Sequence, residues 1–334
     1  MDKLNCYKNF AICDLHLHLD GALSSEVIIK IAQKEGIDLP TYYADELQKY
    51  LCVGPECKSL NDYLEKFKIP NLVLQSEYGL TEATKDLLDR LSQQGIKYVE
   101  IRMAPQLSTN KGLSQEEVVR ALLKVIKKSE KVFKVKSRLI LCMMRGSNNR
   151  VENIETIRVA KEFLGKGVVA IDLAGAEALY PNENFKEELL EAKVLGVPFI
   201  IHAGEASGYL SVESALDLGA VRIGHGIHAL ENEATIKRLA INKIPLEVCI
   251  TSNLDTKAVN SLKEIRIKEL LDKGVIITIN TDDPTVSKTT LAREYELLKE
   301  LGLSNYDVYK IVENTIASSF LSDKEKIKLK EYIK

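Results

Sequence analysis

Short apolar runs recur along the chain and predict its strands. Eight of them stand out, and most end at a Gly, Pro, Asn or Asp residue. Many are rich in Val and Ile, as strands buried on both faces of a parallel sheet are. The eight predicted strands cover residues 11–19, 96–105, 137–146, 168–175, 197–205, 220–226, 244–253 and 275–284.

Amphipathic helical patterns separate these runs. After Ser114, apolar residues recur at helical spacing, and Ser114 with Glu117 forms a capping-box pattern. Several of the other patterns end at a glycine directly before the next strand. Alternation of strand and helix, repeated eight times, predicts an α/β fold: a (β/α)8 TIM barrel in a single domain over residues 1–334. A doubly wound open sheet is the alternative.

The connection after the first strand, from about residue 20 to residue 95, is unusually long. It holds helical patterns on both sides of a polar, Tyr-rich stretch. In a barrel, such a loop rises over the C-terminal ends of the strands, so we predict a lid or specificity segment. A helical insertion without such a role is the alternative. Further helices are predicted after the eighth strand, near residues 288–302, 305–319 and 323–333.

Composition and charge narrow the classes of function. Among the 334 residues, 46 Lys and Arg stand against 48 Asp and Glu, which does not indicate a surface for nucleic acid or acidic lipid. No apolar stretch approaches the roughly 18 residues of a membrane span, and the N-terminus lacks the apolar core of a secretory signal. The six cysteines include no C-x-x-C pair. We therefore expect a cytoplasmic protein without nucleic-acid or membrane partners.

Only five histidines occur in the chain, and their positions point to a shared site. His16 and His18 lie two apart on the first predicted strand, so both side chains point to one face. His202 lies near the end of the fifth strand and His225 at the end of the sixth. In a parallel barrel the C-terminal ends of all strands meet at one mouth. His228 falls in the loop beyond the sixth strand and is left outside this group.

Three imidazoles and one carboxylate are a ligand set suited to Zn²⁺, with Fe²⁺ or Mn²⁺ as weaker alternatives. His16, His18 and His202 supply the imidazoles, and either Asp282 or Asp283, at the end of the eighth strand, supplies the carboxylate. Such a site holds one ion per chain and leaves a position for water. A bound zinc ion lowers the pKa of that water towards about 7.

Two further side chains near this mouth suit acid–base chemistry. Glu205 lies three residues after His202, and a carboxyl buried in a barrel mouth can have a raised pKa and act as a general acid. His225 is placed to orient or deprotonate the water, or to stabilise a developing alkoxide. The sequence therefore predicts a metal-dependent hydrolase with Glu205 and His225 as its catalytic residues.

Six fragments occur together in one order along the chain: DLHLHLDGAL, DLAGAE, HAGE, GHGIHAL, TSNLDTKAV and NTDDP. In this combination the chain resembles the adenosine deaminase branch of the metal-dependent amidohydrolases. The resemblance runs from about residue 11 to residue 295. It departs from the family pattern at Ile250, where relatives often carry proline.

The resemblance implies a reaction and a role for each matching residue. The reaction is zinc-dependent hydrolytic deamination of adenosine or 2′-deoxyadenosine at C6 of the purine; methylthioadenosine and adenine are alternative substrates. Relatives that prefer free adenine tend to carry Glu at the position of Asp20, which favours a nucleoside here. The implied ligands are His16, His18, His202 and Asp282; Glu205 protonates N1; His225 orients and activates the water; and the substrate contacts are His18, Asp20 at the ribose, Gly175 at N3 and Asp283 at N7.

Three alternative functions would each require residues that can be looked for in the sequence. A dinuclear amidohydrolase bridges two metals with a lysine on the fourth strand, but that strand ends in DLAGAE. A nucleotide substrate needs basic groups near its phosphate; Arg102 and Arg145 are candidates, although surface or ion-pair roles are favoured for both. A binding protein that has lost catalysis would lack the acid or the base, whereas Glu205 and His225 are both present.

Overall fold

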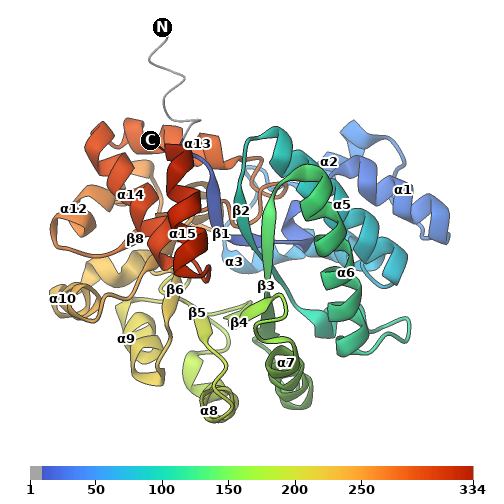
Figure 1. Ribbon diagram of the computed structural model, residues 1–334, viewed down its shortest axis with the longest axis horizontal. Helices are drawn as coiled ribbons and strands as arrows, with labels where there is room; N and C mark the ends of the chain where they lie inside the picture. Colours follow the sequence, from blue (N-terminus) through green and yellow to red (C-terminus); the bar gives the residue numbers. More distant parts are fainter. Residues whose placement is uncertain (1–9, 334) are drawn as a thin grey trace, which may run out of the picture.

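Eight parallel strands form one sheet in the order of the sequence, from β1 to β8, in the computed structural model, which describes residues 10–333 (Figure 1). Because this order never reverses, the doubly wound alternative is excluded and the predicted (β/α)8 barrel is confirmed. The strands are β1 (Cys13–His18), β2 (Tyr98–Met103), β3 (Lys136–Met144), β4 (Val168–Ala174), β5 (Phe199–Ala203), β6 (Arg222–His225), β7 (Leu246–Val248) and β8 (Ile277–Ile279).

The barrel closes between β1 and the residues that follow β8. The backbone N–H of Asp282 donates to the carbonyl of His16 at 2.8 Å, and the N–H of His18 donates to the carbonyl of Asp282 at 2.9 Å. Deeper in the barrel, the N–H of Leu15 donates to Oδ1 of Asn280 at 3.0 Å. Closure therefore uses the backbone of three residues that were predicted as metal ligands.

Helices cover the outer face of the strands, and much of the apolar core lies between the two layers (Figure 1). In β5, Phe199 and Ile201 belong to this core, whereas the alternate residues Ile200 and His202 face the barrel interior. The helices are α1 (Ser25–Glu35), α2 (Ala44–Leu51), α3 (Leu60–Leu64), α4 (Lys68–Val73), α5 (Glu77–Gln93), α6 (Gln115–Phe133), α7 (Arg150–Phe163), α8 (Lys186–Val194), α9 (Tyr209–Leu218), α10 (Glu233–Asn242), α11 (Ile250–Asp255), α12 (Ile267–Asp272), α13 (Leu291–Glu300), α14 (Asn305–Ser318) and α15 (Asp323–Lys330).

The predicted ends of two strands are wrong, for a local reason in each case. The seventh strand was expected to reach residue 253, but β7 stops at Val248 because α11 begins at Ile250. The eighth was expected to reach residue 284, but β8 stops at Ile279, and Asp282 has a left-handed φ of 62° that no strand accommodates. The capping box of Ser114 and Glu117 at the start of α6 is confirmed.

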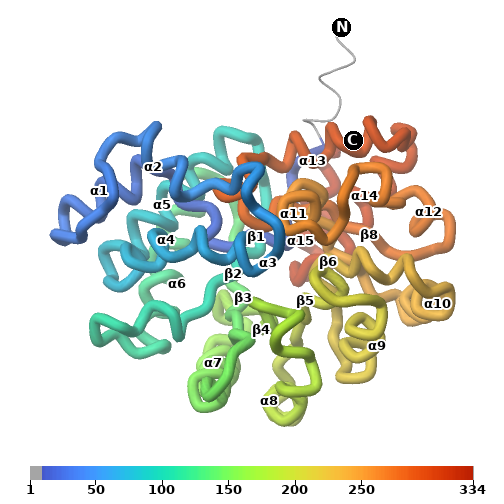
Figure 2. The backbone as a smooth tube through the Cα atoms, turned by 180° about the vertical axis from the view of Figure 1, so that it is seen from behind, coloured from blue at the N-terminus to red at the C-terminus, as the bar shows by residue number. Residues whose placement is uncertain are grey.

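Helices α1 to α5 make up the long connection after β1, and α3 lies at the end of the barrel that faces the viewer in Figure 2. Helix α15 lies at the opposite end, towards the viewer in Figure 1. The connection is tied to the segment after β8. Cys52 Sγ donates to the carbonyl of Thr285 at 3.2 Å, and the hydroxyls of Tyr63 and Ser287 share a hydrogen bond of 2.9 Å.

None of the helices in the described part of the chain is long and apolar enough to cross a membrane. Five cysteines lie within residues 10–333, and all five are buried free thiols: Cys13, Cys52, Cys57, Cys142 and Cys249. The sixth, Cys6, lies outside the described residues.

Candidate active site

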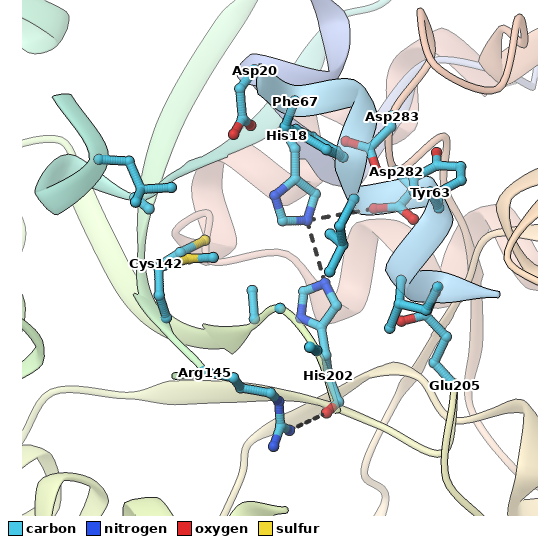
Figure 3. Close-up of a pocket in the computed structure, with 18 of the residues that line it drawn as sticks. His18, Asp20, Tyr63, Phe67, Cys142, Arg145, His202, Glu205, Asp282 and Asp283 are labelled. Carbon is cyan, nitrogen blue, oxygen red and sulfur yellow. Dashed lines mark hydrogen bonds and ion pairs between the residues drawn. The ribbon is translucent and has the colours of Figure 1, made fainter. Parts of the chain in front are cut away.

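The side chains of His16, His18, His202 and Asp282, from three parts of the barrel, converge at its mouth. Figure 3 shows His18, His202 and Asp282 of this group. The ring nitrogen Nε2 of His16 lies 3.1 Å from Nε2 of His202, and His18 Nε2 lies 3.3 Å from each of them. Oδ1 of Asp282 completes the group, at 3.1 Å from His16 Nε2 and 3.4 Å from His18 Nε2. The spacing of the sequence left Asp282 and Asp283 open, and the structure brings Asp282 to the histidines.

These separations fit a single metal ion. Tetrahedral donors at about 2.0–2.1 Å from a metal lie about 3.3–3.4 Å from one another. Within the described residues a second group, His225, Cys249 and Asp282, also has donor atoms close enough for an ion. Burial, followed by the charge of Asp282, raises the pKa of Cys249 well above its ordinary value, so this thiol is held in its protonated, poorly ligating form.

Buried carboxylates orient two of the three ligand rings. Nδ1 of His16 lies 2.9 Å from Oε2 of Glu247, and Nδ1 of His202 lies 3.0 Å from Oδ2 of Asp172. In its neutral form each ring thus carries its proton on Nδ1 and presents a free Nε2 lone pair to the site. Arg102 links the two carboxylates, with Nη2 at 2.5 Å from Glu247 and Nη1 at 3.3 Å from Asp172.

Sequence reasoning missed this supporting layer. Arg102 was considered for a phosphate, with a surface or ion-pair role favoured; it is fully buried and paired, so the ion-pair role is the one observed. The available signal was a charged residue at an inward position inside an otherwise apolar strand, as in YVEIRM, VVAIDLA and LEV. Buried charges in such positions need partners, and here the partners are histidines of the four-residue group or one another.

Protonation states at the mouth also suit a metal. Burial lowers the pKa of His18 well below its ordinary value and lowers that of His202, so both rings stay neutral. Burial by itself would raise the pKa of Asp282, but the adjacent His16, with His225 and His18, holds it well below its usual range. Neutral imidazoles beside an ionised carboxylate are the ligating forms of these groups.

The first turn of α11 explains the TSN sequence that the family resemblance singled out. Ser252 Oγ donates to Oδ2 of Asp282 at 2.7 Å, which leaves Oδ1 free to face the histidines. The side-chain amide of Asn253 meets Nδ1 of His225 at 3.1 Å. With the amide nitrogen donating there, the neutral His225 ring carries its proton on Nε2. Ile250, where relatives carry proline, is the first residue of α11, a position that proline favours.

Two residues of the mouth are among the non-glycine residues with a left-handed φ. His225 and Asp282 have left-handed φ angles of 60° and 62°, which are uncommon without glycine and cost of order 1–3 kcal/mol each. Asp282 is held in this conformation by its two backbone bonds to β1, and His225 by its pairing with Ala203. The fold therefore imposes the directions of these side chains.

Glu205 and His225 lie close together beside the four-residue group. His225 Nε2 is 3.6 Å from Oε2 of Glu205 and 3.9 Å from Oδ2 of Asp282. Burial, followed by the carboxylates of Asp282 and Glu177, raises the pKa of Glu205 well above its ordinary value. Burial lowers the pKa of His225 well below its ordinary value. Near neutral pH the site therefore presents a protonated carboxyl and a neutral imidazole.

A cavity opens onto this centre, and helices of the long connection cover part of it (Figure 3). Leu60, Leu64 and Phe67 line the covered side. Asp20 and Asp283 line the cavity too, and each has a buried oxygen without a hydrogen-bond partner among the described residues. These two carboxyls are available to a ligand. Gly175 also lines the cavity, at a φ of 106° that L side chains rarely adopt.

Among residues 10–333, Arg145 is the only lysine or arginine that lines this cavity, and its terminal nitrogens are engaged. One Nη donates to the carbonyl of Tyr180 at 2.6 Å; the other donates to Oδ1 of Asn182 and to the carbonyl of His202, each at 2.6 Å. His228 lies apart from the four-residue group, and its Nδ1 lies 2.7 Å from Glu231. The structure thus leaves His228 out of the group, as the sequence did.

We predict that Asp172→Asn weakens Zn²⁺ binding by about 10- to 100-fold, because it removes the charge that orients His202. Competition between the apoprotein and a chromogenic chelator measures this affinity. Asp307→Asn is the matched control, since Asp307 is a buried carboxylate that caps α14 away from the mouth. Equal affinities of the Asp172 variant and the control would contradict a role for Asp172 in holding the metal.

Comparison with known proteins agrees with this geometry. The family model described as adenosine deaminase matches residues 12–334. The chain is 46% identical over 331 residues to an adenosine deaminase of Haemophilus ducreyi, covering 97% of this chain and 96% of the relative. It is 41% identical over 331 residues to an adenosine deaminase of Clostridium botulinum strain Langeland, covering 98% of each.

Two solved structures are similar over nearly the whole chain. The adenine deaminase of Arthrobacter aurescens has a TM-score of 0.87 at 31% identity, covering 96% of this chain and 97% of its own. Arabidopsis ADAL complexed with IMP has a TM-score of 0.85 at 23% identity, covering 98% and 97%, which is a likeness of fold. The family match and the identities of the curated relatives show that this chain belongs to the adenosine deaminase family.

Proposed function

We propose that this protein hydrolyses the 6-amino group of adenosine and 2′-deoxyadenosine, which yields inosine or deoxyinosine and ammonia. Membership of the adenosine deaminase family supports this reaction. The observation that carries it is the convergence of three Nε2 atoms and Asp282 Oδ1 at the bottom of a cavity that also exposes Glu205 and His225. These groups together supply a metal site, a proton donor and a neutral imidazole.

The proposed metal is one Zn²⁺ ion per chain, held by His16, His18, His202 and Asp282. Three nitrogens and one oxygen with tetrahedral separations are a ligand set that Zn²⁺ prefers. Harder cations such as Mg²⁺ prefer oxygen ligands. When bound, the ion lowers the pKa of a water ligand towards about 7 and so makes a nucleophile available at neutral pH. Asp172 and Glu247 keep the rings of His202 and His16 directed at it.

Glu205 is the proposed general acid. Its carboxyl is 3% exposed and its raised pKa keeps it protonated, so it can donate to N1 of the purine as C6 is attacked. Protonation at N1 spares the ring a full negative charge when C6 becomes tetrahedral. The site therefore lowers the barrier through a proton that is already in place.

His225 is the proposed partner of the attacking water. Because Asn253 occupies Nδ1, the Nε2–H of the neutral ring points to the region between Glu205 and Asp282. In that position it orients the water by a hydrogen bond to its oxygen and stabilises the charge that develops there. Its low pKa keeps the ring neutral throughout.

We infer the contacts to the rest of the substrate from the groups that line the cavity. Asp283 is proposed to bond N7 of the base, the N–H of Gly175 to bond N3, and Asp20 to bond a ribose hydroxyl. The unpaired Asp20 oxygen favours a nucleoside over free adenine, which has no hydroxyl to offer it. A nucleoside is also favoured over a nucleotide, since the lining residues that the structure describes include four carboxyl groups and no unpaired lysine or arginine terminus.

An absorbance assay across related purines tests this assignment. We expect turnover of adenosine and 2′-deoxyadenosine at much higher kcat/KM than of AMP, because no lysine or arginine terminus among the described lining residues is free to compensate the phosphate. Adenine is expected to react poorly because Asp20 is left unpaired. A preference for AMP or for adenine would refute the nucleoside assignment, while a preference for methylthioadenosine would keep the chemistry and change the substrate.

Removal and return of the metal form a separate prediction. Protein stripped by a chelator should lose deamination and regain it when about one equivalent of Zn²⁺ per chain is added. Metal analysis and the rate are measured on the same sample, and circular dichroism checks that the stripped chain stays folded. Full activity after complete removal of metal would overturn the proposed mechanism.

A further inference from the structure

Glu177 makes an unusual set of hydrogen bonds just behind the proposed acid. Its carboxylate accepts the N–H groups of four consecutive residues, Gly204 to Ser207, at 2.7, 3.0, 2.6 and 3.1 Å. It also accepts the hydroxyl of Ser211 at 2.5 Å. The side chain is 1% exposed and lies in the loop after β4, three residues beyond Ala174. Neither the metal site nor the proposed substrate contacts use it.

The four amides belong to the loop that carries Glu205. This loop joins β5 to α9, and all four N–H groups would have to find water or another acceptor if Glu177 were absent. Gly204 begins it with a left-handed φ of 69°. The direction of the Glu205 side chain therefore depends on a carboxylate that comes from a different loop.

We infer that Glu177 is a positioning residue for deamination: it fixes the loop from Gly204 to Ser207 so that the Glu205 carboxyl faces N1 of the bound purine. This inference rests on the proposed function. It also explains why one short segment contains both Gly175 and Glu177. The contact proposed for N3 and the support for the contact proposed at N1 are then two residues apart, on one loop.

Electrostatics agrees with this geometry. The five donors satisfy the acceptor oxygens of one carboxylate. Glu177 is also, after burial and Asp282, a further cause of the raised pKa of Glu205. Glu177 therefore both aims the acid and helps to keep its proton in place.

The test separates an effect through Glu205 from a general loss of structure. In Glu177→Gln, an NH₂ group that cannot accept replaces one of the two oxygens that bind the loop. We expect kcat to fall by about 100-fold, the penalty typical of a misplaced catalytic group. Glu188→Gln is the matched control, because Glu188 is a buried glutamate on α8 outside the site. Its kcat should stay near that of the unmodified protein.

A double-mutant cycle with Glu205→Gln decides between the two explanations. If Glu177 acts through Glu205, then adding Glu177→Gln to Glu205→Gln should lower the residual kcat by less than about twofold. A merely structural role would produce the same large loss in both backgrounds, and that result would overturn the inference. An unchanged kcat in Glu177→Gln alone would overturn it too.

Ser211→Ala keeps the inference testable if Glu177→Gln does not fold. It removes only one donor to Glu177, so a few-fold loss of kcat is expected, again absent in the Glu205→Gln background. Failure of the proposed function is recognised separately: the unmodified, zinc-loaded protein would release no ammonia from adenosine. If that protein is active but Glu205→Gln is equally active, the acid itself is wrongly assigned and the inference falls with it.

Discussion

Two backbone hydrogen bonds close the barrel and assemble the site in the same step. Asp282 bonds through its N–H to His16 and through its carbonyl to His18, so its carboxylate is fixed against the two histidines of β1. A register shift of one residue would turn those side chains to the other face of the strand. His202 arrives on β5, so the third imidazole meets the others only when the full circuit of strands has formed.

Below the mouth, the barrel interior is charged where an ordinary core is apolar. Arg102 shares its guanidinium between Asp172 and Glu247, and each of these carboxylates holds the far nitrogen of a ligand histidine. Removing one member leaves its partner buried and uncompensated, which is why such groups act together. Glu177 fixes the loop that carries Glu205, just as Asp172 and Glu247 orient the histidine rings. The order of the site thus comes largely from carboxylates that are not proposed to touch substrate.

Much of this arrangement could be predicted from the sequence, and the remainder depends on register and turns. The repeated alternation of strand and helix predicted the barrel. The spacing of His16 and His18, with the rule that parallel strands end at one mouth, predicted the gathering of its polar residues. Spacing could not choose between Asp282 and Asp283, since the choice depends on a left-handed turn at Asp282. The pairing of Arg102 with Glu247 joins residues 145 positions apart, which no local pattern reveals.

We propose that the mouth of this barrel is a mononuclear metal site built from imidazole nitrogens and a carboxylate. X-ray absorption spectroscopy at the zinc edge of zinc-loaded, deaminating protein tests it most directly. For such a site we expect one zinc per chain, with nitrogen and oxygen neighbours at about 2.0–2.1 Å and an imidazole scattering pattern. A sulfur neighbour at about 2.3 Å would instead indicate a site at Cys249, and a second metal at about 3.5–4 Å would indicate a dinuclear centre. Either result would contradict a mononuclear site of imidazole nitrogens and a carboxylate.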